Sequence, residues 1–312
     1  MSDSVKPLVS VICLAYNHEK YIKNALDGFV MQETNFPFEV IIHDDASTDK
    51  TADIIREYEN KFPNIIKPIY QTENQFSKHA GIYKNIVFPL TKGKYIASCE
   101  GDDFWIDKHK LQKQVDFMEN NPNYSCVFHP VNVLVKEKVV RNDKRWNNEM
   151  DFTAYEVIRY GGDFMSSPSI MYRREMATQW PKFRLIANTG DYPLQILLAL
   201  NGKVHYLPDI MACYRFMAEG SWSQKIMTDP QFLANHCNAA IRWLIQLNED
   251  TKGKYQTAIS YEVFKNIRLL RDRNALPEGS PLYKLWVNTE RALAEAQDKI
   301  IGQVAGKIKI KN

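Results

Sequence analysis

The 312-residue sequence contains no apolar run near the roughly 18 residues that a membrane-spanning helix needs. Its five cysteines are scattered and include no C-x-x-C pair, which favours a protein of the reducing cytoplasm. The net charge is only +3 and there is no basic stripe, so nucleic acid is not an expected partner. With 45% apolar and 25% charged residues, the composition is that of a globular protein with one large domain, or a core domain and an appendage.

Apolar runs alternate with amphipathic segments over the first part of the chain. The runs predict strands at residues 8–14, 38–43, 65–70 and 94–99. Helical spacing predicts helices at 21–29, at 47–58, at 80–88 and, after residue 107, around Leu111, Val115 and Met118. Strands that alternate with helices favour an α/β fold with a doubly wound, mostly parallel sheet.

The pattern changes after residue 123. Further strands are expected at residues 166–172, 204–206 and 210–214, and a helix that opens with an acid at 191–200. Past about residue 229 the chain turns helical, and a last helix is expected at 281–299. This predicts a small mixed sheet followed by a helical C-terminal extension.

Polar side chains follow three of the predicted strands at the points where they end. These clusters are Tyr16-Asn17-His18, His43-Asp44-Asp45 and Glu100-Gly101-Asp102-Asp103. In doubly wound sheets ligands bind beyond the carboxyl ends of the strands. One ligand could therefore touch all three clusters.

The segment from Cys99 to Trp105 places three carboxylates within four positions. Like charges at this spacing raise one another's pKa unless a cation lies between them. A Mg²⁺ or Mn²⁺ ion that carries a phosphate meets this need, because such ions prefer a few carboxylates together with substrate oxygens. The alternative is a solvated acidic turn after a strand.

Four segments, taken together and in their order along the chain, resemble the family 2 glycosyltransferases of the GT-A fold. They are Val9-Ser10-Val11-Ile12, Tyr16-Asn17, Asp44-Asp45-Ala46-Ser47-Thr48-Asp49 and Gly101-Asp102-Asp103-Phe104-Trp105. The similarity covers roughly residues 7 to 222. It implies a GT-A domain at 1–225, with a nucleotide-sugar half at 7–122 and an acceptor half at 123–225, and a helical region at 226–312. It also implies inverting, hexosyltransferase-like transfer from a nucleotide-sugar.

The resemblance assigns roles to particular positions. Asp103, helped by Asp102, would hold a divalent metal, Mn²⁺ or Mg²⁺, and Glu100 takes the first place of the family's D-x-D. His79 is the alternative to Lys78 as a basic residue that meets the nucleotide. The expected contacts of the nucleotide-sugar are Ala15, Tyr16, Asn17, Asp44, Asp45, Lys78, Asp102 and Arg215.

The acceptor side carries a second group of motifs. Thr189-Gly190-Asp191-Tyr192 resembles the family's acid motif, which makes Asp191 the catalytic base, and Ser166-Ser167-Pro168-Ser169 resembles the strand before it. The stretch from Tyr214 to Ser223 resembles the late Y-R-x-H…S element that closes over the diphosphate. Met217 stands where a histidine is sometimes found, so the metal would rely on carboxylates, phosphates and water.

Structural alternatives accompany these assignments. Asp44 and Asp45 could cap the following helix, and Asp191 could be the N-cap of its own helix. Trp105 and Tyr16 could be packing residues, and Arg215 could pair with a nearby acid. Two rival functions are a nucleotidyltransferase, against which the glycine-free segment 15–20 argues, and a non-catalytic binding protein with the same fold.

The resemblance also suggests partners. It implies a nucleotide-sugar donor, most simply a UDP-sugar, and a saccharide or lipid-linked saccharide acceptor in polysaccharide biosynthesis, at the cytoplasmic face of a membrane. The basic tail at residues 307–311 could touch an anionic membrane surface, although a solvated, frayed tail is the favoured interpretation. The C-terminal helices allow a homo-oligomer.

Overall fold

The computed structural model describes residues 6–78, 81–273, 275, 279, 282–284 and 287–289. The chain divides into two compact units, residues 1–224 and 225–312. The first unit contains every motif singled out above. The expected division of this unit into halves at residue 122 stays a prediction.

The first unit is built on an eight-stranded sheet with the strand order β3-β2-β1-β4-β10-β6-β11-β9. Its strands in chain order are β1 (Val9–Ala15), β2 (Phe38–Asp44), β3 (Ile66–Tyr70), β4 (Tyr95–Ser98), β6 (Tyr124–Phe128), β9 (Met150–Phe152), β10 (Met171–Arg173) and β11 (Lys203–Tyr206). Strands β3, β2, β1 and β4 are mutually parallel, and β11 runs parallel to β6. Strands β9 and β10 are antiparallel to their neighbours.

A second, four-stranded sheet has the order β5-β12-β7-β8. Its strands are β5 (Phe104–Trp105), β7 (Val131–Val135), β8 (Lys138–Asn142) and β12 (Ala212–Arg215). Strand β12 is parallel to β7 and antiparallel to β5. The sheet thus joins the strand after the acidic turn to the late Tyr214-Arg215 segment. A large, mostly parallel sheet, a smaller mixed sheet and C-terminal helices confirm the predicted fold class.

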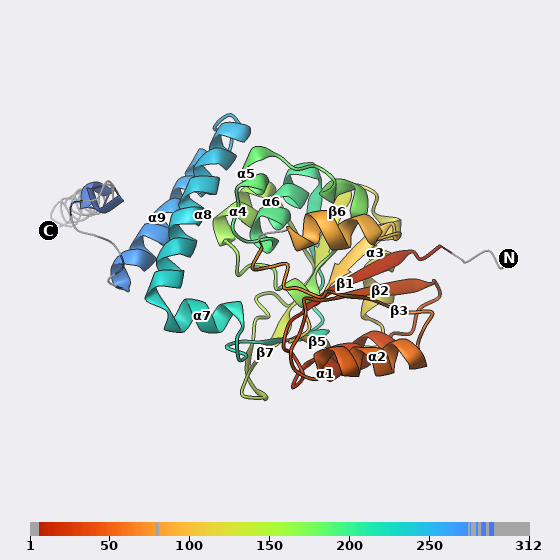
Figure 1. Cartoon of the computed structure of the whole chain (residues 1–312). Coiled ribbons are helices and arrows are strands. Elements are labelled where there is room, and N and C mark those ends of the chain that lie inside the picture. Colours follow the sequence, from red (N-terminus) through yellow and green to blue (C-terminus); the bar gives the residue numbers. More distant parts are fainter. Residues whose placement is uncertain are drawn as a thin grey trace, which may run out of the picture. The chain divides into compact units, whose positions relative to one another are not determined.

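Helices cover the sheet of the first unit, and α1 and α2 pack together beside strands β1 to β3 (Figure 1). The helices that begin in this unit are α1 (Ile22–Val30), α2 (Thr51–Lys61), α3 (Lys110–Asn120), α4 (Ala154–Tyr160), α5 (Lys182–Leu185), α6 (Asp191–Asn201) and α7 (Trp222–Thr228). Alternate residues of β1, namely Val9, Val11 and Cys13, are fully buried in the main core. This burial explains the apolar run with which the strand was predicted.

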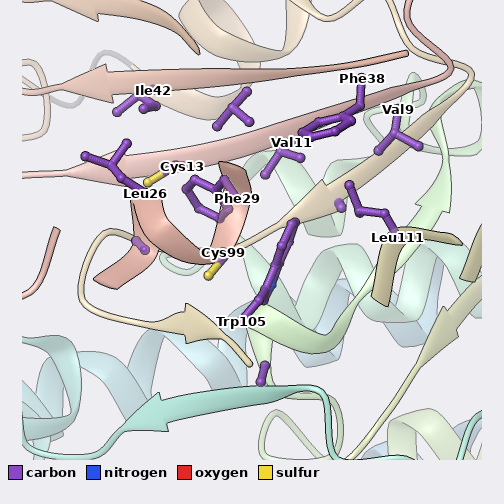
Figure 2. Packing of buried hydrophobic residues seen from close by; sticks show 14 of the residues in the cluster. Val9, Val11, Cys13, Leu26, Phe29, Phe38, Ile42, Cys99, Trp105 and Leu111 are labelled. Carbon is purple, nitrogen blue, oxygen red and sulfur yellow. The ribbon is translucent and has the colours of Figure 1, made fainter. Parts of the chain in front are cut away.

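Trp105 lies in the same core, with its ring edge-on to Phe29 at 5.0 Å between centroids (Figure 2). It is 2% exposed, so the packing alternative for this residue holds. Gly28 of α1 allows the close approach, because a Cβ there would lie 2.9 Å from main-chain atoms of Trp105. Helix α1 is therefore pressed directly against the strand that follows the acidic turn.

Three predicted elements differ in the structure. The helix expected at 80–88 is a π-helical turn at Ile82–Val87 followed by a 3₁₀ turn at Phe88–Leu90, with residues 79–80 outside the description. The helix expected from Ser47 begins at Thr51. The strand expected at 166–172 opens as a 3₁₀ turn, Ser167–Ser169, because Pro168 donates no main-chain hydrogen bond to a sheet. Periodicity alone does not separate these states.

The second unit contains α8 (Pro230–Asp250) and α9 (Gln256–Asp272). Asp229 caps α8 by accepting from the main-chain N–H groups of Gln231 and Phe232. A small buried cluster joins the two helices through Leu233, Cys237, Ile241, Ile267 and Leu270. The predicted helix at 281–299 lies largely outside the described residues, and the basic tail lies wholly outside them. Within the described part of the chain, no helix is long and apolar enough to cross a bilayer.

Candidate active site

The ends of β1, β2 and β4 bring the three polar clusters to one edge of the sheet. Ala15 lies opposite Asp44 in the parallel register, and its carbonyl oxygen accepts from the N–H of Asp45 at 2.9 Å. The N–H of Gly101 donates to the carbonyl oxygen of Leu14, also at 2.9 Å. Main-chain hydrogen bonds therefore hold the acidic turn beside the loop that begins at Tyr16.

Asn17 ties the first two clusters together. Its side-chain Oδ1 accepts from the N–H of Thr48 at 2.8 Å, and its own N–H donates to Oγ of Ser47 at 2.9 Å. Asn17 has φ 55°, a left-handed conformation that asparagine tolerates better than most residues. The neighbouring Tyr16 ring is 45% exposed at this edge, so Tyr16 is not a core packing residue.

Asp44 and Asp45 are both buried but do different things. Asp45 accepts the N–H groups of Gln75 at 2.7 Å and Phe76 at 3.0 Å, and so fixes the loop after β3. Asp44 has a buried Oδ1 with no hydrogen-bond partner. Neither residue caps α2: the carboxylate of Asp49 instead accepts the N–H of Thr51 at 2.9 Å.

Lys78 lies at the surface, with its side chain 52% exposed and paired with Glu73. Its contact with the nucleotide remains a prediction. The alternative residue, His79, lies outside the described residues.

Glu100 and Asp102 of the acidic turn lie near Asp191 of the acceptor side. Burial and then the negative charges of Asp102 and Asp191 raise the pKa of Glu100 to about 8. The causes of this shift include carboxylates from two distant segments and no cation of the protein. A divalent cation would relieve their repulsion.

Asp103 does not share this position. It is 2% exposed, and its Oδ1 accepts the main-chain N–H of Arg215 at 2.8 Å. Burial, followed by the charge of Asp102, raises its pKa well above the usual value. One oxygen of its carboxyl group thus joins the acidic turn to β12, and the metal role expected for Asp103 stays a prediction.

A metal at this edge would have two protein carboxylates, Asp102 together with Asp103 or Glu100. Across the described residues, no group of three or more His, Cys, Asp or Glu side chains is placed to hold a metal ion. Met217, at the position where the resemblance allows a histidine, is 37% exposed with φ 61°. The oxygen donor set suits Mg²⁺ or Mn²⁺, which retain water and substrate phosphate oxygens as further ligands.

Arg215 is buried and already paired. Its Nε and Nη2 donate to both carboxylate oxygens of Glu137 at 2.8 and 2.9 Å, and its Nη1 donates to the carbonyl oxygen of Asp102 at 2.6 Å. The rings of Tyr21 and Phe104 lie 5.0 and 4.6 Å from the guanidinium carbon. The alternative of pairing with a nearby acid therefore holds, and a phosphate would have to use the remaining N–H groups of Nη1 and Nη2 or displace Glu137. No sequence pattern marked Glu137.

A pocket of about 380 Å³ lies at this ion pair, and both Arg215 and Glu137 line it. Its lining also includes Tyr21, Lys136, Met217 and Gln224. These residues come from the segment before α1, from the β7–β8 hairpin and from the chain after β12.

Asp191 is the first residue of α6, and the N-cap is Gly190, so Asp191 is not the cap of its own helix. The side chain is exposed, and its Oδ2 accepts from Oγ of Ser167 at 3.2 Å. Helix α6 is anchored behind it, because Nε2 of Gln195 donates to the carbonyl oxygen of Met165 at 2.8 Å. The carboxylate thus lies at the exposed start of a helix whose first turns are fixed.

Comparison with known proteins identifies the family to which this chain belongs. The family model described as "Glycosyl transferase family 2" matches residues 10–180, which include all the donor-side motifs. The chain belongs to glycosyltransferase family 2.

Curated relatives agree with the family. An uncharacterized protein of Mycobacterium tuberculosis is 37% identical over 222 residues, which cover 69% of this chain and 60% of that protein. The chain thus spans about three fifths of the length of that relative. The UDP-Glc:alpha-D-GlcNAc-diphosphoundecaprenol beta-1,3-glucosyltransferase WfaP of Escherichia coli is 32% identical over 165 residues, 53% of this chain and 54% of its own length.

Solved structures show the same fold. The S. aureus TarS 1-349 structure in complex with UDP-GlcNAc has a TM-score of 0.59 and 20% identity, covering 86% of this chain and 82% of TarS. The mannosyltransferase PcManGT of Pyrobaculum calidifontis, in complex with GDP-Man and Mn²⁺, has a TM-score of 0.53 and 18% identity, covering 93% and 81%. This family 2 glycosyltransferase therefore has a GT-A-like fold.

Proposed function

We propose that this family 2 glycosyltransferase moves a hexose from a UDP-sugar to an acceptor hydroxyl by a single, metal-assisted displacement that inverts the anomeric centre. One observation carries the proposal. Asp191 accepts a hydrogen bond from Ser167 in the 3₁₀ turn that Trp105, two residues after Asp103, binds through the carbonyl oxygen of Pro168, so the acceptor-side carboxylate is joined to the strand that leaves the acidic turn. A donor held at the strand ends would then have a carboxylate base beside the carbon that reacts.

The nucleotide would lie over the ends of β1 and β2. The unpartnered Oδ1 of Asp44 suits an N–H donor of a nucleobase, because a buried acceptor gains most from a hydrogen bond that the free protein lacks. The exposed ring of Tyr16 is a surface on which a base can stack. Ala15 and Asn17 shape the same loop. The UDP-GlcNAc bound in TarS and the UDP-Glc in the name of WfaP support a uridine donor.

The diphosphate would lie at the acidic turn. Asp102, together with Asp103 or Glu100, would hold Mn²⁺ or Mg²⁺ there, and the ion would act as a Lewis acid that stabilises the charge of the leaving diphosphate. The Mn²⁺ bound with GDP-Man in PcManGT supports this use of a metal. Arg215 holds the main-chain carbonyl of Asp102 and so fixes the loop that carries the metal ligands.

Asp191 would act as the general base. An acceptor hydroxyl has a pKa far above neutrality, so its proton must be removed as the new bond forms. An exposed carboxylate at the start of α6 can approach an acceptor from solvent. Because direct attack by the hydroxyl needs no enzyme nucleophile, one displacement suffices and the configuration inverts.

The acceptor class rests on the relatives. WfaP is named for a diphosphoundecaprenol-linked sugar, and a Bacillus subtilis relative, 39% identical over 123 residues, is named as a putative teichuronic acid biosynthesis glycosyltransferase. We assign the chain to the assembly of a polysaccharide on a saccharide or lipid-linked saccharide acceptor.

The test is release of nucleoside diphosphate from UDP-GlcNAc, UDP-glucose and GDP-mannose with Mn²⁺, after a thermal-shift screen of the same donors. Replacement of Asp191 by Asn should lower the turnover of the accepted donor about 100-fold or more, as loss of a general base does. UDP affinity should stay within about twofold. The control is Asp53→Asn, a change on the exposed face of α2. Full turnover by Asp191→Asn would remove the base assignment.

A further inference from the structure

We propose that Ser167 is a positioning residue for Asp191: its hydroxyl holds one carboxylate oxygen, so that the other points at the acceptor. This inference rests on the proposed function of Asp191 as the base. The contact joins Oγ of Ser167 to Oδ2 of Asp191 at 3.2 Å, across 24 residues of sequence.

The main chain of Asp191 is fixed, but its side chain is not fixed by packing. Helix α6 is tied to the segment before it through Tyr192, whose hydroxyl donates to the carbonyl oxygen of Ile158 at 2.6 Å, and through Gln195. The Asp191 side chain itself is exposed. An exposed aspartate samples several rotamers unless a partner selects one. The hydrogen bond from Ser167 supplies that selection.

The serine is held more rigidly than the carboxylate it contacts. Ser167 is the first residue of the 3₁₀ turn Ser167–Ser169. The carbonyl oxygens of the next two residues accept hydrogen bonds from buried side chains. Nε1 of Trp105 donates to the carbonyl oxygen of Pro168 at 2.9 Å, and Nε2 of Gln114 donates to that of Ser169 at 2.8 Å. Trp105 and Gln114 are themselves fully buried.

These anchors connect the base to the donor side. Trp105 lies two residues after Asp103 in the strand that leaves the acidic turn. The path from Asp102 to Asp191 therefore runs through a short strand, one buried indole and one 3₁₀ turn. Such a path sets the spacing between the donor and the base, and small errors in this spacing are costly: a shift of about 1 Å can lower a rate about 100-fold.

The hydrogen bond also gives the two carboxylate oxygens of Asp191 different roles. Oδ2 accepts from Ser167, which leaves Oδ1 to take the acceptor proton. Threonine has the same hydroxyl and can keep the contact, whereas alanine cannot. A neighbouring residue offers a matched control, because Oγ of Ser166 donates to Asp143 at 3.0 Å.

The experiment compares Ser167→Ala, Ser167→Thr and Ser166→Ala in the full chain, with UDP-GlcNAc and UDP-glucose as donors, Mn²⁺ present and water as the acceptor. Ser167→Ala should lower kcat about 10- to 100-fold, while KM for the donor and the melting temperature change little. Ser167→Thr should stay within about threefold of the wild type, and Ser166→Ala should keep the wild-type kcat. In an Asp191→Asn background, Ser167→Ala should cause no further loss.

Two results would overturn the inference. One is an unchanged kcat in Ser167→Ala while Asp191→Asn is inactive. This result would support Asp191 as the base and refute only the positioning role of Ser167. The other is a crystal structure of Ser167→Ala with Asp191 in one unchanged rotamer, a result that decides the matter even if neither donor is hydrolysed. Full activity of Asp191→Asn would instead refute the proposed base, and the role of Ser167 with it.

Discussion

The main-chain N–H of Arg215 and the Oδ1 of Asp103 form a 2.8 Å hydrogen bond that spans 112 residues of sequence. The same arginine binds the carbonyl oxygen of Asp102 through its guanidinium group. The acidic turn is therefore attached to β12 at two consecutive residues. Of the two adjacent aspartates, Asp103 fastens the turn through its side chain and Asp102 only through its main chain.

The different contacts of Asp103 and Asp102 predict different effects when each residue is replaced. Asp103→Asn keeps an oxygen acceptor for the N–H of Arg215 and removes a carboxyl group whose pKa burial has raised, so stability at pH 7.5 should be retained or improved. Asp103→Ala leaves that N–H without a partner and should be less stable than Asp103→Asn by about 1–3 kcal/mol. Urea unfolding measures both. Equal stability of the two variants would contradict the structural role.

Asp102 should behave differently. Asp102→Asn removes one of two protein carboxylates available to a metal, so the gain in UDP affinity that Mn²⁺ provides should largely disappear. The unfolding midpoint should change little, because Asp102 is only partly buried. Calorimetric titration of UDP with and without Mn²⁺ measures the effect, with Asp103→Asn as the control. The metal assignment fails if Asp102→Asn keeps the full Mn²⁺ dependence.

Glu137 tests whether Arg215 is a phosphate ligand. Glu137→Gln weakens the ion pair with the buried guanidinium, which should lower the melting temperature by a few degrees, since about 1 kcal/mol shifts it by roughly 2–4 °C in a chain of this size. UDP affinity should remain within about twofold. Markedly tighter UDP binding would show that Glu137 competes with the diphosphate for Arg215, and would restore the contact first expected from the sequence.

The donor edge of the site could be read from the sequence because three polar clusters each follow an apolar, β-branched run. Parallel strands place such clusters at one edge, and Ala15 and Asp44 do lie opposite each other. The order of the strands from Tyr95 onward was not readable, because β10 inserts antiparallel between β4 and β6 from far along the chain. Local periodicity carries no information about such a partner.

The different roles of the acidic residues could not be predicted from the sequence either. Asp102 and Asp103 are adjacent residues of one type, and the long-range contact of the Asp103 side chain with Arg215 distinguishes them. Glu137 lies at the tip of the β7–β8 hairpin with φ 61°, a position that no motif marks. The Ser166–Ser169 segment was visible as a motif, but its hydrogen bonds with Trp105, Gln114 and Asp191 join residues far apart in the sequence.

Asp44 should contribute to nucleotide affinity more than to stability. Its Oδ1 has no partner in the free protein and its Oδ2 accepts only a long 3.4 Å bond from the N–H of Ser47, so Asp44→Ala removes little from the folded state but deletes the acceptor offered to the base. UDP affinity should fall about tenfold or more, in keeping with one hydrogen bond to a charged group. Asp45→Ala is the contrasting change, because it frees two N–H groups of the following loop and should lower stability. Unchanged UDP affinity in Asp44→Ala would exclude the base contact.

Lys110 predicts how stability depends on pH. It is fully buried, its Nζ donates to Oε1 of Gln114 at 2.8 Å and lies 4.1 Å from the centre of the Trp105 ring, and burial lowers its pKa to about 7. The unfolded chain has the ordinary lysine pKa near 10.4, so between about pH 7 and 10 it binds more protons than the folded chain. The contribution of Lys110 therefore raises the free energy of unfolding as the pH rises through this window, by up to about 1.4 kcal/mol per pH unit.

Urea unfolding from pH 7 to 9.5 should show this slope as the difference between the wild type and Lys110→Met. The exposed Lys108→Met should be indistinguishable from the wild type. Parallel curves for the wild type and Lys110→Met would mean that Lys110 stays charged in the folded protein.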